Sequence, residues 1–572
     1  MKRWVRLVLL IVLMVKPLAL SAQTEDDVVE ELTALEEDDA FFYGEDMLSH
    51  LQRLRRHPVN LNSASRSDLE STMLLTPFQI ESILSRIASS GPILSFAELG
   101  LLYGFDERTV ERLRRYFILG EAVRRPENFL KDETTSVYSR YQRVLDPASE
   151  QHLVRLRSSY LDRVDLSAVW KGSSTRKSSE NFATGGVSFS GLGRGAVRLE
   201  KVILGDFYAR MGQGLAAWNG FSFSGAGEST GFVKNSEPVS LYTSSDTSKL
   251  LRGGAFSVSV KRFRISAGYS FRGRESVYGL SYSGRRTRYS LSYFRKEAVG
   301  SVLSADFIAG LPGVVVFAEG AWNPETQSFA AVGGASLEME KVTLHFLLRG
   351  YGKDFSSPMG GAYSSLSKIS NQQGASLRMT GTLYGKTSYA VGADYSAYPA
   401  PRYHVKDPSS TFKAYVKLSW DDSSFGSPVK NEFWIKGCAK TDTRYSTPVE
   451  KDRILSLKTG GKVMLLGGLS LVLRGEMNNL GGRAFSSYLK LEGRWLGGTI
   501  GTAMFHVRDW AARIYFPEAE LPYSFSSHLL YGQGTDVCCL VSIRPSRWLS
   551  LYLKYQYRRG ISTAKAAVRV EL

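Results

Sequence analysis

Apolar and polar residues alternate along most of the chain from residue 134 to residue 572. In the segment 263–271, apolar or aromatic residues occupy every second position, with basic, small or polar residues between them. The same period of two recurs at 412–420, at 549–557 and at 564–572. Successive side chains of a β-strand point to opposite sides, so this period predicts strands with one apolar and one polar face.

These segments have the length of strands that cross an outer membrane, about 9–11 residues. A soluble β-sandwich also alternates, but the strand length and the aromatic residues near strand ends favour a membrane barrel. If turns and loops roughly double the length of each strand, residues 134–572 form an antiparallel transmembrane β-barrel with an even number of strands, about 20. The fold class is therefore mainly β, and the polar strand faces line the lumen.

Ten basic residues fall on the predicted lumen face, and two interpretations of them stay open. The first is a path for a polyanion, and the second is a mixed polar lumen in which charges are paired. The positions expected to face inward are Arg262, Arg264, Arg288, Arg349, Lys413, Lys417, Lys490, Arg494, Lys554 and Arg569.

Residues 51–117 follow a helical period instead. Thr76 and Gln79 form a capping-box pattern with Pro77 at the first helical position, and apolar residues follow at helical spacing up to Gly91-Pro92. Ser95 and Glu98 form a second capping-box pattern. Further helices are expected at 63–73 and after Asp106. The segment predicts a small all-α N-terminal domain.

The stretch VNLNSASRSDLESTMLLTPFQIESILSRIASSGPILSFAELGLLYGFDERTVERLRRYF resembles the tandem helix-hairpin-helix domain of ComEA-type DNA-uptake proteins. The matching signals are N-L-N-x-A near Asn60, an apolar helix, Gly91-Pro92, Phe96-x-x-Leu99 and Gly104-Phe105. In that family, the hairpin glycines let backbone N–H groups approach a DNA phosphate at a helix N-terminus. The resemblance therefore implies binding to DNA without sequence specificity.

The two hairpins depart from the family pattern. The first, Leu75 to Gln79, has no glycine, and Pro77 removes a backbone donor. The second keeps Gly104 but places Asp106 where the second glycine would fall, and a carboxylate there repels phosphate. If DNA is bound, the resemblance places contact on the second hairpin. The DNA-binding candidates are Gly104, Phe105, Arg108, Arg112 and Arg115. The alternative is a module that keeps the fold and docks a protein.

The N-terminal end predicts export across the inner membrane. Three basic residues, a short apolar run and small residues up to Ala22 have the features of a secretory signal peptide. Residues 24–50 contain eleven acidic residues and no Lys or Arg, whereas residues 118–572 carry most of the net charge of +17. The expected domains are a signal peptide at 1–22, an acidic leader at 23–50, the helical domain at 51–120, a linker at 121–133 and the barrel at 134–572.

Two glycine triplets, Gly212-Gln213-Gly214 and Gly532-Gln533-Gly534, stand out in the β region. Neither is followed by the Lys-Ser/Thr pair of a phosphate loop. Glycine within a strand marks a bulge or a close backbone approach. We expect both triplets to be structural, in the barrel wall or in a loop that folds inward. A helical module, these triplets and a barrel together resemble a group of outer-membrane proteins from Bacteroidetes-type bacteria.

The remaining chemistry is sparse. The three cysteines and seven single histidines show no metal-ligand spacing. A hydrolase needs a Ser/His/Asp cluster, which single residues such as His345 or His506 do not establish. We therefore expect no catalytic residues, no metal, no cofactor and no enzymatic activity.

Two functions remain. One is DNA uptake, with a periplasmic helical module that binds DNA. The other is a structural or export role, in which the module docks a periplasmic or inner-membrane protein partner. Outer-membrane lipid surrounds the barrel in both.

Overall fold

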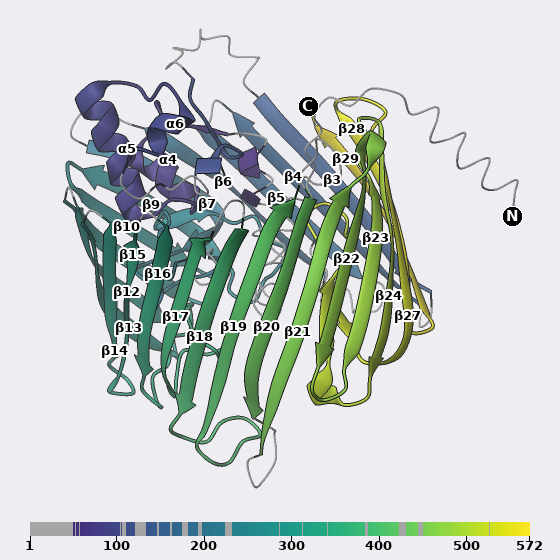
Figure 1. Ribbon diagram of the computed structural model, residues 1–572. Helices are drawn as coiled ribbons and strands as arrows, with labels where there is room; N and C mark the ends of the chain where they lie inside the picture. Colours follow the sequence, from purple (N-terminus) through teal and green to yellow (C-terminus); the bar gives the residue numbers. More distant parts are fainter. Residues whose placement is uncertain are drawn as a thin grey trace, which may run out of the picture.

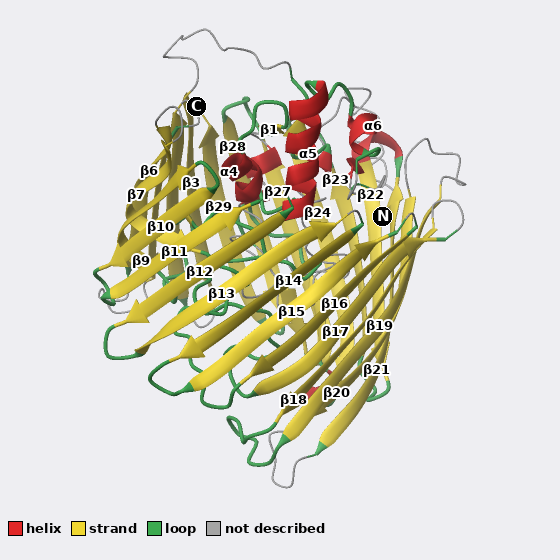
Figure 2. Ribbon diagram, turned by 90° about the vertical axis from the view of Figure 1, so that its left-hand side faces the viewer, coloured by secondary structure: helices red, strands yellow, loops and turns green. Residues whose placement is uncertain are grey.

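The computed structural model describes residues 50–51, 53–55, 58–102, 105, 110–111, 113–120, 133–145, 148–160, 163–173, 181–192, 197–222, 231–284, 286–311, 313–339, 341–383, 387–422, 431–443, 450–524 and 527–571. The expected signal peptide, almost all of the acidic leader and most of the linker lie outside these residues. The described chain forms a large closed β-barrel with a small helical module at one end (Figures 1 and 2).

Within the described residues, the barrel wall has 24 antiparallel strands. β29 pairs with β3 and closes the sheet. The wall strands are β3 (Glu133–Val144), β4 (Ser149–Tyr160), β5 (Val164–Ser173), β6 (Phe182–Leu192), β7 (Val197–Ala209), β9 (Leu251–Val260), β10 (Phe263–Ser270), β11 (Glu275–Ser283), β12 (Thr287–Lys296), β13 (Gly300–Leu311), β14 (Val314–Asn323), β15 (Ser328–Glu338), β16 (Val342–Tyr351), β17 (Gln372–Thr382), β18 (Thr387–Tyr398), β19 (Ser409–Asp422), β20 (Asn431–Thr443), β21 (Lys451–Met464), β22 (Leu469–Asn478), β23 (Arg483–Leu491), β24 (Leu496–Val507), β27 (Gly532–Ile543), β28 (Leu549–Arg558) and β29 (Ile561–Glu571). Short strands β8 (Val239–Leu241), β25 (Ile514–Pro517) and β26 (Ser527–Leu530) accompany them.

The expected count of about 20 strands is too low, and the reason lies in the turns. Many connections are much shorter than the strands that they join, as at 261–262, 465–468 and 492–495. Short turns leave room for more strands in the same length of chain. The even number is confirmed, so β3 begins and β29 ends at the same end of the barrel.

The outer surface of the barrel is apolar. Along β19, for example, Phe412, Val416 and Leu418 are exposed, whereas Tyr415 between them is buried. The predicted alternation therefore places the apolar set outside, where an outer-membrane barrel contacts lipid. The fold is that of an outer-membrane β-barrel. Among the described residues, none of the helices is long and apolar enough to span a membrane.

The helical module contains α4 (Arg66–Ser71), α5 (Pro77–Ser90) and α6 (Phe96–Leu99). Its N-caps are Ser65, Thr76 and Ser95, and both Ser65 and Thr76 form complete capping boxes. The helix expected at 63–73 is therefore shorter, because Ser65 caps it. Strands β1 (Val59–Asn60) and β2 (Phe117–Ile118) pair in parallel. A buried core that includes Leu69, Ile80, Ile83, Leu99 and Leu113 holds the helices together.

Candidate functional site in the barrel lumen

A long connection after β7, described at residues 210–222 and 231–250, folds into the lumen and carries the first glycine triplet. Gly212 and Gly214 have φ angles of +57° and +94°, a region that glycine adopts without strain. The Glu319 carboxylate on β14 accepts hydrogen bonds from the backbone N–H groups of Gln213 (2.7 Å) and Leu215 (3.0 Å). A Cβ atom on Gly212 would lie 2.9 Å from this carboxylate. The triplet therefore anchors the loop to the lumen wall, which confirms its expected structural role.

A second connection, residues 352–371 between β16 and β17, packs on the first inside the lumen. Gly361 N donates to Gly214 O (2.9 Å), and Trp218 N donates to Met359 O (2.8 Å). The Lys234 ammonium donates to Gly361 O. Burial, followed by the nearby Lys249 charge, lowers the pKa of Lys234 to about 7. The two connections therefore form one body, which we call the inner loops.

The inner loops cover an apolar part of the lumen face on β13–β16. Its buried residues form one cluster with Leu215, Ala216 and Phe232 of the inner loops. The cluster also contains Phe78, from the first turn of α5 in the module. The residues of the wall that belong to this cluster are Val302, Ile308, Val315, Phe317, Ala321, Ala330, Val332, Leu347 and Tyr351.

The module is held at this end of the lumen by polar contacts as well. Glu70 of α4 forms a buried ion pair with Arg264 of β10 (2.8 Å), which also pairs with Glu200 of β7 (2.6 Å). Burial would raise the pKa of the Glu70 carboxyl, but Arg264 and Arg288 hold it below its usual value. The Asn235 side-chain amide donates to Leu75 O at the start of the segment Leu75–Gln79 (3.3 Å). This segment of the module is therefore a docking element toward the lumen.

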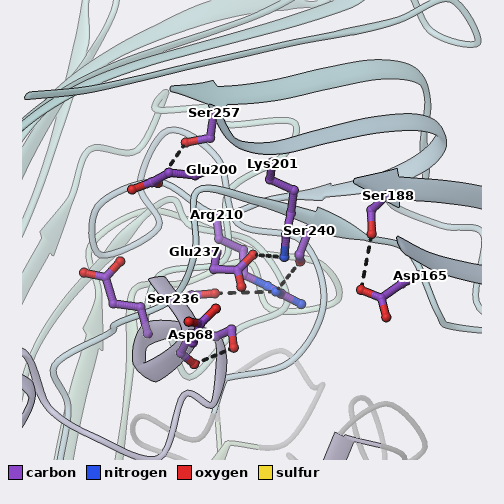
Figure 3. Close-up of polar contacts among 12 residues, drawn as sticks. Asp68, Asp165, Ser188, Glu200, Lys201, Arg210, Ser236, Glu237, Ser240 and Ser257 are labelled. Atoms are coloured by element: carbon purple, nitrogen blue, oxygen red, sulfur yellow. Dashed lines mark hydrogen bonds and ion pairs between the residues drawn. The ribbon is translucent and has the colours of Figure 1, made fainter. Parts of the chain in front are cut away.

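Polar pairs fix the first inner loop against β7 near the module, as Figure 3 shows. Lys201 of β7 pairs with Glu237. Arg210 donates to Ser240 Oγ at 2.9 Å, and its guanidinium lies 4.3 Å from the centre of the Tyr208 ring. Most of these charged and polar side chains are buried. A buried charge is stable only beside a partner, and each charged group here has one nearby.

A third inward element, the hairpin β25–β26 with its connection, lies against the last strands of the barrel. The Glu520 carboxylate forms ion pairs with the ammonium groups of Lys554 (3.0 Å) and Lys565 (2.7 Å). The Gln556 side-chain amide donates a hydrogen bond to the Glu518 carboxylate (2.8 Å). Burial would raise the pKa of Glu520, but the two lysines hold it at about 2. This part of the lumen is therefore also filled by paired charges.

The lumen face of β19–β21 differs from these regions. Lys417, Lys436 and Lys458 stand directly opposite one another on the three strands, and Lys413 stands opposite Lys440. All five side chains are half-buried. The Lys436 ammonium lies 4.9 Å from the centre of the Tyr415 ring, and that of Lys417 lies 5.8 Å from the centre of the Trp434 ring. We call these five lysines the lysine wall.

The structure places most of the expected inward basic residues on lumen faces. Arg349 has a fully buried side chain that binds Asp394 at 3.0 Å, and Lys554 binds the inward hairpin. Lys413 and Lys417 belong to the lysine wall, and Lys490 is buried beside Glu492. Arg264, Arg288 and Arg569 also lie on inward-facing positions of strands. Two expectations are wrong, because Arg262 and Arg494 lie in turns between strands, where the alternation no longer applies.

The residues expected to bind DNA are only partly described. Phe105 is buried in the core of the module, so its ring packs inside the domain. Arg115 is exposed at the surface. Gly104, Arg108 and Arg112, with Asp106, lie outside the described residues. DNA binding at the second hairpin therefore stays a prediction.

The other groups considered for chemistry are dispersed. His345 binds Ser336 Oγ (2.8 Å) on β15–β16, whereas His528 pairs with Asp536 on β26–β27. These half-sites lie on separate parts of the barrel. In the described part of the chain, no group of three His, Cys, Asp or Glu residues could hold a metal. The second glycine triplet forms the first three residues of β27. It therefore lies in the barrel wall, which is one of the two places expected for it.

Sequence reasoning missed Glu319, Phe78 and the inner loops as a unit. A signal was present in the stretch VVVFAEGAW, residues 314–322, which is apolar at nearly every position. Such a strand is apolar on both faces, here toward the outer surface and toward the inner loops, and its single carboxylate is the group that anchors the inner loops.

No family model and no curated protein matches the chain. Among solved structures, it is similar to the P pilus usher (PapC) translocation pore, with 10% identity, a TM-score of 0.40, and coverage of 77% of this chain and 99% of that one. It is also similar to the siderophore receptor PirA from Pseudomonas aeruginosa (9% identity, TM-score 0.38, 77% and 79%). A third is the copper transporter OprC (8% identity, TM-score 0.41, 77% and 82%). Because the identities and TM-scores are this low, the functions in these names are those of the named proteins and are not assigned to this chain.

Proposed function

We propose that the protein is a transport channel of the outer membrane, export-related in type, whose helical module closes the lumen from the periplasmic side. The observation that carries this proposal is the insertion of the first hairpin. Phe78 packs among lumen residues, and Glu70 pairs with Arg264 inside the barrel. The eroded hairpin thus has a use in docking, which favours the docking interpretation over phosphate binding at that hairpin.

The lengths of the connections support this orientation. The long connections 210–250, 352–371 and 508–531 join strands at the end away from the module. The connections at the module end are mostly short. Bacterial outer-membrane barrels have short periplasmic turns and longer extracellular loops. By this rule the module lies in the periplasm, where a partner or a substrate would reach it first.

Conductance in planar lipid bilayers tests the closure. In Phe78→Ala, the docking side chain is lost, and we expect a higher mean conductance than in the wild type. Leu101→Ala is the matched control, because Leu101 is a module residue that is 85% exposed. Equal conductance of wild type, Phe78→Ala and Glu70→Gln would contradict a closing role for the module.

DNA uptake is the second candidate, and the exposure of Arg115 favours it. Because the first hairpin is docked in the lumen, the second hairpin is the one available to contact DNA phosphates. Its Gly104 is the residue expected to allow a close backbone approach. Fluorescence anisotropy of the full chain with a short duplex provides the test. We expect log affinity to fall with log salt at a slope of about −2 to −4. Arg115→Ala should make this slope shallower, and Asp106→Gly should tighten binding. Absence of salt-dependent binding at low ionic strength would leave the docking role alone.

Neither function requires catalysis. Transport through a lumen needs a channel, charged groups along it and a removable closure. The barrel, its lumen side chains and the docked module supply these. We therefore infer that the protein is not an enzyme.

A further inference from the structure

We propose that the segment Trp218–Phe221 of the first inner loop couples the helical module to the second inner loop, residues 352–371, so that each holds the other in its closed position. This inference rests on the proposed function and deepens it, because it names the part of the lumen that regulates the closing module. Coupling of this kind is reciprocal. A partner that displaces the module also loosens the second inner loop, and a ligand that rearranges this loop also loosens the module.

The module and the first inner loop exchange aromatic side chains. Phe221 of the first inner loop is 3% exposed and belongs to the buried core of the module. Its ring lies 5.3 Å from the His50 ring. In the opposite direction, Phe78 of the module belongs to the apolar cluster of the inner loops and the wall. Each core contains a residue from the other part, so displacement of the module exposes apolar surface in both cores.

The second inner loop contacts the other end of the segment, at Trp218. Trp218 N donates to Met359 O (2.8 Å), next to a parallel bridge between Ala217 and Met359. A Cβ atom on Gly361 would lie 2.6 Å from Trp218 O, so a side chain there would collide with the segment. Trp218 Nε1 in turn donates to Phe221 O (3.4 Å). The second inner loop and the core of the module are therefore joined through four residues.

The segment has little freedom to deform between its two ends. The fully buried Asn219 side chain accepts a hydrogen bond from Ala209 N (2.6 Å). Gly220 has a φ of +81°, and a Cβ atom there would lie 2.8 Å from the Tyr208 ring. Close-packed interiors transmit strain because they are hard to compress, and chains of packed side chains carry coupling between sites. A change at one end of the segment therefore strains the other end.

Distances between two spin labels test this coupling in the full-length protein in detergent. One label replaces exposed Ser89 of the module and the other replaces exposed Arg286 of the wall, in a cysteine-free background. Gly361→Ala pushes on Trp218 from the second inner loop. We expect the population outside the main distance peak to rise at least about fivefold in this variant, as for an overpacked contact.

The matched control places a similar collision in the wall. A Cβ atom on Gly493 would lie 2.5 Å from Leu496 O, in the turn between β23 and β24. Gly493→Ala should therefore leave the distance distribution unchanged. Migration with and without boiling verifies that each variant is folded. Met359→Ala loosens the same contact with Trp218 by removing a buried side chain, and it should broaden the distribution even if Gly361→Ala does not fold.

A double variant separates coupling from independent loosening. Phe221→Ala should itself loosen the module, and the addition of Gly361→Ala should then change the distance distribution little further. Phe221→Leu keeps an apolar side chain in the core of the module, so it should restore the response to Gly361→Ala. An unchanged distribution in Gly361→Ala, or additive effects in the double variant, would overturn the proposal. Distances are measured without conduction, so this failure is distinct from that of the Phe78→Ala experiment.

Discussion

The lumen face of β13–β16 and the lysine wall on β19–β21 belong to one sheet, but they differ in what covers them. On β13–β16, the inner loops and Phe78 cover apolar residues, and the buried carboxylate of Glu319 has specific donors. On β19–β21, half-buried lysines stand side by side. Alternation therefore predicts which way a side chain points, whereas the energetic role of that side chain depends on the segment packed above it.

The largest expected effect is the loss of a buried charge beside the inner loops. Arg349 has a side chain with no exposed surface, and it binds both oxygens of Asp394 at 3.0 Å. Arg349→Gln leaves Asp394 without this partner, which should cost about 3–5 kcal/mol. The temperature at which the folded band is lost on electrophoresis should fall clearly. An unchanged temperature would mean that this part of the lumen is as open to water as the lysine wall.

A smaller effect is expected from Gly214, where the two inner loops meet. Its φ of +94° disfavours any side chain, and a Cβ atom would lie 3.0 Å from Ala362 N. Gly214→Ala should cost about 1–3 kcal/mol and make the inner loops more sensitive to protease. Gly320→Ala is the control, because a Cβ atom there meets nothing within 4 Å. Equal sensitivity of the two variants would show that the inner loops do not depend on this close approach.

Much of this fold could be predicted from local sequence. Capping by Thr76 and Ser95, the strand positions and the direction of Lys413, Lys417 and Lys554 follow from short-range patterns. The docking of Phe78 and the anchoring role of Glu319 could not be predicted, because they depend on contacts between residues far apart in the chain. The number of strands was underestimated because turn lengths are set by local geometry and not by the alternation.

The contact between the module and the first inner loop, where the His50 ring lies 5.3 Å from the Phe221 ring, should weaken on acidification. Burial, followed by the Arg53 charge, lowers the pKa of His50 well below 6.5, and its Nε2 lies 2.9 Å from Thr72 O. A lowered pKa means that the folded state binds fewer protons, so stability is present above pH 6.5 and is lost below it. Between pH 6.5 and pH 5, the loss is at most about 2 kcal/mol.

Spin labels at exposed Ser89 of the module and exposed Arg286 of the wall can follow this displacement in a cysteine-free background. The distance distribution should broaden from pH 7.5 to pH 5. His50→Gln keeps a donor for Thr72 but cannot gain a charge, so its distribution should change much less. A pH response that persists in His50→Gln would assign it to another group that titrates in this range, with Lys234 of the inner loops, whose pKa is about 7, the next candidate.

The smallest effect has the opposite sign from the first and therefore tests the comparison most directly. Lys436 stands directly opposite Lys417 on one neighbouring strand and Lys458 on the other, so its ammonium faces a like charge on both sides. Lys436→Gln removes this repulsion, and it also removes the contact of the ammonium with the Tyr415 ring. We expect a gain of a few tenths of a kcal/mol at low salt, the usual size for cross-strand charge pairs. High salt should shrink the gain, because partly exposed charges are screened. Unfolding in urea at two salt concentrations measures it. An equal loss of stability in Lys436→Gln and Arg349→Gln would contradict this difference between the two parts of the lumen.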